Sequence, residues 1–116
     1  MQSLASQLLS AQGNPRPDDV TEHYATKGGC SLRVNILPDP EGEGSPSVLI
    51  EGDKETLLFL ADLLLAQASD DLDCGVGISP RGPGCALFSK NSEYGIYVHS
   101  LPCVNGEIKV RGEGAE

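Results

Sequence analysis

The chain of 116 residues lacks a long apolar segment and has no basic cluster at its start. A membrane span needs roughly 18 or more apolar residues, and the leucine-rich segment after Glu55 is shorter and contains Asp62. The opening residues, MQSLASQLLSAQG, lack the basic region that begins a signal peptide. We therefore expect a cytoplasmic protein without a membrane-spanning segment.

Basic residues are also few. Eight lysines and arginines stand against 17 aspartates and glutamates, which gives a net charge of −9. Such a surface repels phosphate backbones, so the composition argues against nucleic-acid binding and favours a basic protein partner. The length indicates one domain with a modest core.

Motifs that carry catalytic or cofactor chemistry are missing as well. The four cysteines include no C-x-x-C pair, and the glycine-rich segment CGVGISPRGPGC contains no phosphate-binding loop. Cys85 and His99 could pair as nucleophile and base, but no orienting group accompanies them. We expect a non-enzymatic protein without a cofactor, and in a cytoplasmic chain we expect reduced thiols.

The strongest pattern that is present lies between residues 48 and 69, where a short apolar strand precedes a leucine-rich helix. Gly52 ends the strand, Asp53 is suited to the N-cap, and Glu55 places negative charge in the first helical turn. At about 100° per residue, Glu55, Asp62 and Ser69 form one narrow polar stripe on an otherwise apolar helix. Such a helix must be covered on more than one side.

Alternating apolar residues predict strands on both sides of this helix. Leu32, Val34 and Ile36 indicate a strand with a buried face, joined to residues 48–50 as an antiparallel hairpin. Three further strands are expected at 75–79, 85–90 and 94–100, with residue 85 beside residue 99. One face would hold Val76, Ile78, Ala86, Phe88, Ile96 and Val98, and the other Ser79, Cys85, Leu87, Tyr97 and His99.

The expected fold is therefore α+β, a two-layer ββαβββ arrangement with one mostly antiparallel sheet and one main helix on one face. Residues 30–104 form this domain. Residues 1–29 are expected to be a loose arm, with a short helix at 2–11, because the composition shifts to proline, aspartate and glycine after residue 13. The tail, 105–116, offers one edge strand at 107–110.

Three hypotheses for the function follow from these patterns. The exposed sheet face and the acidic turn after the helix predict a partner-binding surface made of Asp70, Asp71, Asp73, Glu93, Tyr94, Tyr97 and His99. The apolar helix, Leu57–Leu65, offers a homodimer interface instead. The third alternative is a small metal-binding protein that uses Cys85, His99 and Cys103.

The segments VLIEGDKETLLFLADLLLAQA, CGVGISPRGPGCALF and YGIYVHSLPC resemble a family of small bacterial proteins that includes predicted immunity proteins of polymorphic toxin systems. The resemblance covers residues 30–104, and its distinctive parts are the I-E-G-D junction, the S-P-R-G-P-G turn and the H-S-L-P-C segment. It implies a non-enzymatic inhibitor that binds a cognate toxin. Because many such toxins are basic nucleases, an acidic inhibitor would associate with them rapidly.

Overall fold

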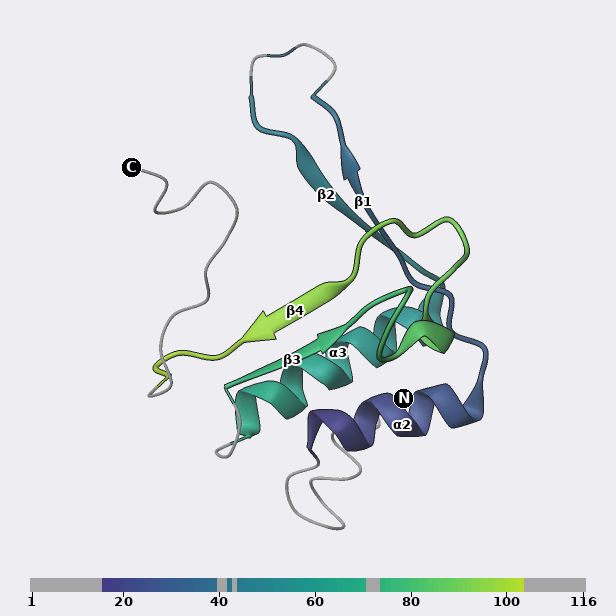
Figure 1. Ribbon diagram of the computed structural model, residues 1–116, viewed down its shortest axis with the longest axis vertical. Helices are drawn as coiled ribbons and strands as arrows, with labels where there is room; N and C mark the ends of the chain where they lie inside the picture. Colours follow the sequence, from purple (N-terminus) through teal and green to yellow (C-terminus); the bar gives the residue numbers. More distant parts are fainter. Residues whose placement is uncertain (1–15, 40–41, 43, 71–73, 104–116) are drawn as a thin grey trace.

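The computed structural model describes residues 16–39, 42, 44–70 and 74–103. Two helices and two small antiparallel sheets make up this part of the chain (Figure 1). In chain order the elements are α2 (Pro17–Lys27), β1 (Arg33–Leu37), β2 (Ser47–Glu51), α3 (Lys54–Ser69), β3 (Gly75–Ile78), the 3-10 helix η1 (Cys85–Leu87) and β4 (Ile96–His99). The α+β class is confirmed, and the segments expected at 2–11 and 107–110 lie outside the described residues.

Helix α2 corrects the prediction of a loose arm for its part over residues 17–27, and residues 1–15 of that prediction lie outside the described residues. Pro17 occupies the first helical position, and Asp18 and Asp19 place negative charge in the first turn. Gly28, at φ 79°, ends the helix, and its N–H donates to the carbonyl of Tyr24 at 3.0 Å. The prolines and glycines that indicated a loop therefore mark the two ends of a helix.

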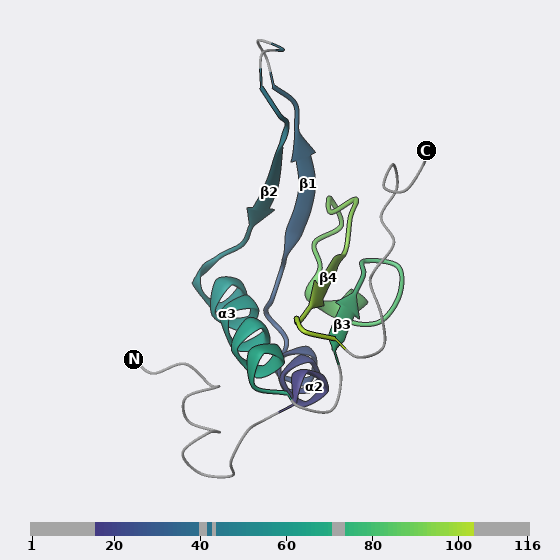
Figure 2. The same ribbon diagram turned by 90° about the vertical axis from the view of Figure 1, so that its left-hand side faces the viewer.

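Helices α2 and α3 pack side by side in antiparallel directions (Figures 1 and 2). At one end Arg16 Nε lies 4.0 Å from Asp70 Oδ2, and at the other Lys27 Nζ lies 2.5 Å from Glu55 Oε2. Between them the ring of Tyr24 meets the ring of Phe59 edge to face, with centroids 5.3 Å apart.

Helix α3 begins as the sequence predicts. The carboxylate of Asp53 accepts a hydrogen bond from the backbone N–H of Thr56 at 2.9 Å, and this bond lowers the pKa of Asp53.

Strands β1 and β2 form the expected antiparallel hairpin, with Val34 opposite Ile50 and Ile36 opposite Val48. The hairpin projects beyond the helices (Figure 2). Val34 is buried at its base, as predicted, whereas Ile36 and Val48 are 45% and 59% exposed because they lie on the projecting part. The buried Ser92 accepts the Val34 N–H at 2.8 Å and so ties the base to a later segment.

The second half of the chain differs from the predicted three-stranded arrangement. Residues 85–90 form no strand: Cys85–Leu87 is the 3-10 helix η1, so β3 pairs directly with β4. The physical reason lies in the preceding loop, where Ser79 N–H donates to Pro83 O at 2.7 Å and Leu87 N–H donates to Gly84 O at 2.9 Å. Because these backbone groups are hydrogen-bonded within turns, they are not available to pair with a neighbouring strand.

The core lies where α2, α3, β1 and β3 meet. Its buried apolar residues are Val20, Tyr24, Cys30, Leu32, Val34, Phe59, Leu63, Ala66, Ile78 and Leu87, with Val76, Phe88 and Ile96 packed at its margin. Leu87, expected on the open face, is fully buried. Neither helix in the described part of the chain is long and apolar enough to cross a membrane.

Candidate functional site

Helix α3 buries three polar side chains beside its core residues Phe59, Leu63 and Ala66, and it exposes leucines on its outer side. Thr56, Asp62 and Gln67 are at most 1% exposed, whereas Leu57 and Leu64 are 46% and 47% exposed. The sequence placed Asp62 on a polar stripe, and that stripe faces α2 and the core. Exposed leucines at these positions give α3 a second apolar side, in addition to the one that packs in the core.

Each buried polar side chain of α3 forms a hydrogen bond with a different segment of the chain. Thr56 Oγ1 accepts a hydrogen bond from the Ser31 N–H at 2.9 Å, and Asp62 accepts one from the Tyr24 hydroxyl at 2.7 Å. Gln67 Nε2 donates to the Ser100 hydroxyl at 2.8 Å. These bonds, together with the burial of Phe59 and Leu63, hold α3 with its remaining leucines pointing outward.

The outward residues form what we term the leucine face: Leu57, Ala61, Leu64, Leu65 and Ala68. Their spacing places them within an arc of roughly 100° around the helix axis. All five are exposed, and the only charged residue on this arc is Lys54, at the start of the helix. In a chain of net charge −9, this face is an uncharged apolar strip.

The predicted sheet surface exists in part, on the outer side of β3 and β4. The Tyr97 ring covers two glycines of the neighbouring strand: a Cβ on Gly75 would lie 2.6 Å from its hydroxyl oxygen, and a Cβ on Gly77 would lie 2.9 Å from its Cδ2. Tyr97 is 60% exposed, and its ring centroid lies 6.4 Å from that of His99. Tyr94 and Glu93 are also exposed, although β4 begins after them.

Of the three aspartates predicted for the acidic turn, only Asp70 lies among the described residues. The Asp70 side chain is only 3% exposed and lies beside Arg16, so it is not a freely accessible surface charge. Asp71 and Asp73 lie outside the described residues. Among the predicted partner-binding residues, the structure therefore brings together Tyr97 and His99 and separates Asp70 from solvent.

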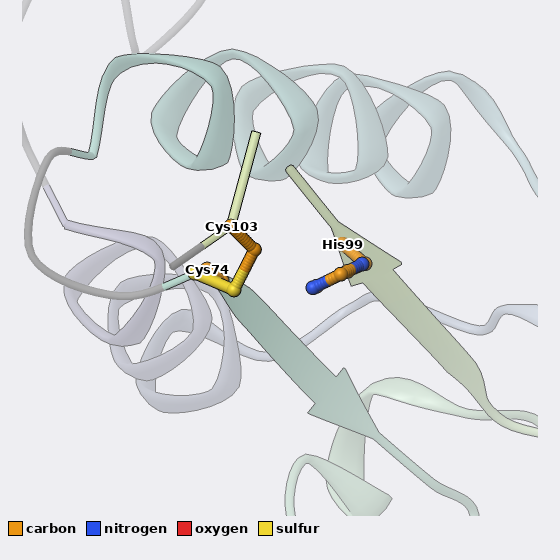
Figure 3. Close-up of side chains that lie close together, drawn as sticks. All are labelled: Cys74, His99 and Cys103. Atoms are coloured by element: carbon orange, nitrogen blue, oxygen red, sulfur yellow. A yellow bond between two sulfur atoms is a disulfide. The ribbon is translucent and has the colours of Figure 1, made fainter. Parts of the chain in front are cut away.

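The structure does not bring the predicted residues Cys85, His99 and Cys103 together, because Cys74 takes the place expected of Cys85. Because Gly75, and not Cys85, lies opposite His99, the sulfur that reaches His99 is that of Cys74. Cys85 lies exposed in η1. The ligand atoms of Cys74, His99 and Cys103 lie within 4.8 Å of one another, and all three residues are half-buried (Figure 3).

Two of these residues are joined as a Cys74–Cys103 disulfide, with Cα atoms 5.7 Å apart, which corrects the expectation of four reduced thiols. That expectation rested on compartment alone, whereas the β3–β4 register places the residue before β3 against the segment after β4. No sequence spacing indicates this pairing, because the two cysteines are separated by 29 positions.

The remaining thiols are poorly placed for catalysis. Cys30 is buried, and this burial raises the pKa of its thiol and so disfavours the reactive thiolate. Cys85 is exposed, but the register does not pair it with His99 as a base. The predicted nucleophile pair of Cys85 and His99 is therefore absent from the described residues.

The sequence pattern indicates an apolar helix at Leu57–Leu65, but it shows neither which of its residues form the exposed leucine face nor that Cys74 neighbours His99. The spacing of Leu57, Ala61, Leu64, Leu65 and Ala68 carries the signal for the first, but the buried polar partners are needed to show which side points outward. In comparisons with known proteins, the chain matches no protein-family model, no curated protein and no solved structure.

Proposed function

We propose that this chain is a non-enzymatic protein-binding domain and that the leucine face of α3 is its principal docking surface. The observation that carries the proposal is the exposure of Leu57, Leu64 and Leu65 on one side of α3. Covering each half-exposed leucine with a partner would contribute about 1 kcal/mol. The projecting hairpin adds exposed apolar side chains at Ile36, Val48 and Ile50.

The partner class comes from charge and from the resemblance to predicted immunity proteins. A net charge of −9 favours a basic partner, and its rapid association would be followed by docking of an apolar strip. We therefore propose an immunity-like inhibitor of a cognate toxin that acts in the cytoplasm. Tyr94, Tyr97 and Glu93 would extend the contact, because aromatic side chains near acidic ones commonly anchor protein partners.

The proposal is tested by expressing the chain together with the product of each neighbouring gene in cells that this product kills. Survival of the cells, with recovery of a stoichiometric complex, supports an immunity role. The informative variant is Leu64→Glu, which should weaken binding by about 2 kcal/mol or more, because it removes apolar contact and brings a charge to the interface. Leu101→Glu is the matched control, since Leu101 is 78% exposed outside α3.

A second candidate is a homodimer through the same helix. The leucine face is apolar along its length, so two copies could pair antiparallel about a twofold axis. That orientation would place Lys54 of each copy at the carboxyl end of the other α3, where the helix dipole favours a cation. Light scattering on the purified chain separates the two: a dimer that Leu64→Glu converts to a monomer favours self-association, and a monomer that binds a toxin favours the inhibitor.

A further inference from the structure

Three potential metal ligands come together at the end of the β3–β4 sheet. Cys74 directly precedes β3, His99 ends β4, and Cys103 follows four residues later. Their ligand atoms lie within 4.8 Å of one another. Figure 3 shows the His99 imidazole pointing toward the two sulfurs from the neighbouring strand.

Backbone and side-chain bonds hold this arrangement independently of the disulfide. The register pairs His99 with Gly75, and the Ser100 N–H donates to the Cys74 carbonyl at 2.6 Å. Gln67, which is 1% exposed, donates through its side-chain Nε2 to the Ser100 hydroxyl at 2.8 Å, and its backbone carbonyl accepts a hydrogen bond from that hydroxyl at 3.3 Å. Cys74 and His99 would therefore stay close after reduction of the disulfide.

We propose that Cys74, His99 and Cys103 form a zinc site that is filled when the two thiols are reduced and is emptied when they join as the disulfide. Two thiolates and one imidazole are ligands that Zn²⁺ prefers, with bonds of about 2.3 Å to sulfur and about 2.0–2.1 Å to nitrogen. A tetrahedron of that size has ligand separations of about 3.5–3.8 Å. The ligand atoms need to move by only about 1–2 Å, which rotation of the two cysteine side chains provides. A water molecule would occupy the fourth position.

Two observations favour this site over a permanent structural disulfide. A disulfide has no need of a histidine directed at it, whereas a metal site needs a third ligand. Cys30 and Cys85 are both free thiols, and Cys85 is exposed, a state typical of proteins kept in a reducing environment. In that environment Cys74 and Cys103 would be thiols, and their thiolates would be available to a metal.

Release of the metal would be a two-electron oxidation. Taking hydrogen peroxide as the oxidant, the two zinc-bound thiolates, one peroxide and two protons give one disulfide, one Zn²⁺ and two water molecules. The sulfur–sulfur bond forms as the oxygen–oxygen bond breaks, and the two electrons lost by the sulfurs reduce the peroxide. A thiol reductant reverses the change at sulfur and restores the site.

The test uses the full chain, reduced and freed of metal without oxygen, and titrated with Co²⁺ as a spectroscopic probe. We expect one equivalent to bind, with thiolate charge-transfer bands and the visible bands of tetrahedral cobalt, and Zn²⁺ to displace it. One equivalent of peroxide should then release one equivalent of zinc and lower the thiol count from four, the number of cysteines, by two.

Variants identify the ligands. Cys74→Ser and Cys103→Ser should abolish the charge-transfer bands or halve them, and His99→Ala should weaken binding by at least the roughly tenfold that loss of an outer-shell partner costs. Cys85→Ser is the matched control and should bind like the unaltered chain. If circular dichroism shows that a cysteine variant does not fold, the His99→Ala variant tests the ligand set instead. His99 is half-buried and outside the core cluster, so this substitution should not prevent folding.

Two results would overturn the proposal. The first is less than about a tenth of an equivalent of cobalt or zinc bound to the folded, reduced chain, given the tight binding of thiolate zinc sites. The second is binding that Cys85→Ser removes as completely as Cys74→Ser does, because the ligands would then be others. Neither result bears on the leucine face, so the zinc site and the proposed binding function fail separately.

Discussion

The hydroxyl of Tyr24 donates a 2.7 Å hydrogen bond to the carboxylate of Asp62, across 38 positions of sequence. Tyr24 is 4% exposed and Asp62 is fully buried. The leucine-rich helix α3 therefore carries a buried carboxylate on the side that faces α2. This bond helps to fix the rotation of α3 about its own axis, because turning the helix would separate Asp62 from its donor and would also expose the buried Phe59 and Leu63. The leucine face is thus kept outward by a buried polar contact and by the core residues beside it.

Removing the donor tests this account. Tyr24→Phe keeps the ring against Phe59 but leaves the Asp62 carboxylate without the Tyr24 hydroxyl, so we expect a loss of about 1–3 kcal/mol in the free energy of unfolding. Urea denaturation followed by circular dichroism measures it. Tyr97→Phe removes the same atom from a 60% exposed side chain and should change stability by less than about 0.5 kcal/mol. Equal effects of the two substitutions would contradict a special role for the Tyr24–Asp62 bond.

Alkaline pH provides a second test of the same contact. Burial, together with the hydrogen bond and negative charge of Asp62, raises the pKa of Tyr24 well above its ordinary 10.0. The folded pKa is above the unfolded one, so the stabilisation is fully present below pH 10 and is lost as the pH rises from about 10 toward the folded pKa.

Ultraviolet absorbance follows tyrosine ionisation directly, because the chain has three tyrosines and no tryptophan. Exposed Tyr94 and Tyr97 should ionise first, and Tyr24 should ionise only at higher pH or with unfolding. Three tyrosines ionising together in the folded protein would contradict the buried environment of Tyr24.

The same leucine-to-alanine substitution should destabilise the protein much more on the buried side of α3 than on its exposed side. Leu63 is fully buried, so Leu63→Ala should cost about 2–5 kcal/mol. Leu64 is 47% exposed, so Leu64→Ala should change the stability of the isolated chain by less than about 1 kcal/mol. Thermal or urea unfolding of the two variants provides the comparison. A large loss from Leu64→Ala in a monomer would mean that another part of the same chain covers the leucine face.

Gly95 permits the close approach of β3 and the segment before β4. A Cβ on Gly95 would collide with the Ile78 carbonyl oxygen and would lie 2.8 Å from the Ser79 Cα, and both are backbone atoms. We expect Gly95→Ala to destabilise the fold by about 1–3 kcal/mol. Gly82→Ala is the control, because its Cβ would lie 3.7 Å from the Ser79 Cβ, an ordinary contact. In chemical denaturation, the Gly95→Ala variant should have a clearly lower free energy of unfolding than the Gly82→Ala variant. The reverse order would rule out the steric explanation.

The disulfide should stabilise the oxidised, metal-free chain. Closing a loop between residues separated by 29 positions removes conformational freedom from the unfolded chain, worth about 3–4 kcal/mol in the chain-entropy description. Cys74→Ser should therefore lower the midpoint of unfolding, measured with a chelator present. Cys85→Ser changes an exposed free thiol and should leave the midpoint of unfolding unchanged within experimental error. Unchanged stability of the Cys74→Ser variant would mean that the disulfide does not constrain the unfolded ensemble.

Much of the local structure could be predicted from short-range signals. Asp53 caps α3, the alternation at 32–36 predicts β1, and the apolar residues at 48–50 predict its partner β2. Helix α2 was missed although Pro17, Asp18 and Gly28 are ordinary helix-end residues, because the same residues are also common in loops. Val20 and Tyr24, four positions apart and both buried, are the signal that could have distinguished the two.

The sequence alone determined where helix α3 and the first hairpin lie, because capping, turn chemistry and hydrophobic alternation act between residues a few positions apart. Only the tertiary structure decided which face of α3 is exposed, that β3 pairs with β4, and that Cys74 meets Cys103 and His99. These outcomes depend on contacts between distant residues, such as Tyr24 with Asp62 and Gln67 with Ser100. Such pairs leave no local pattern, because their geometry exists only after the chain has packed.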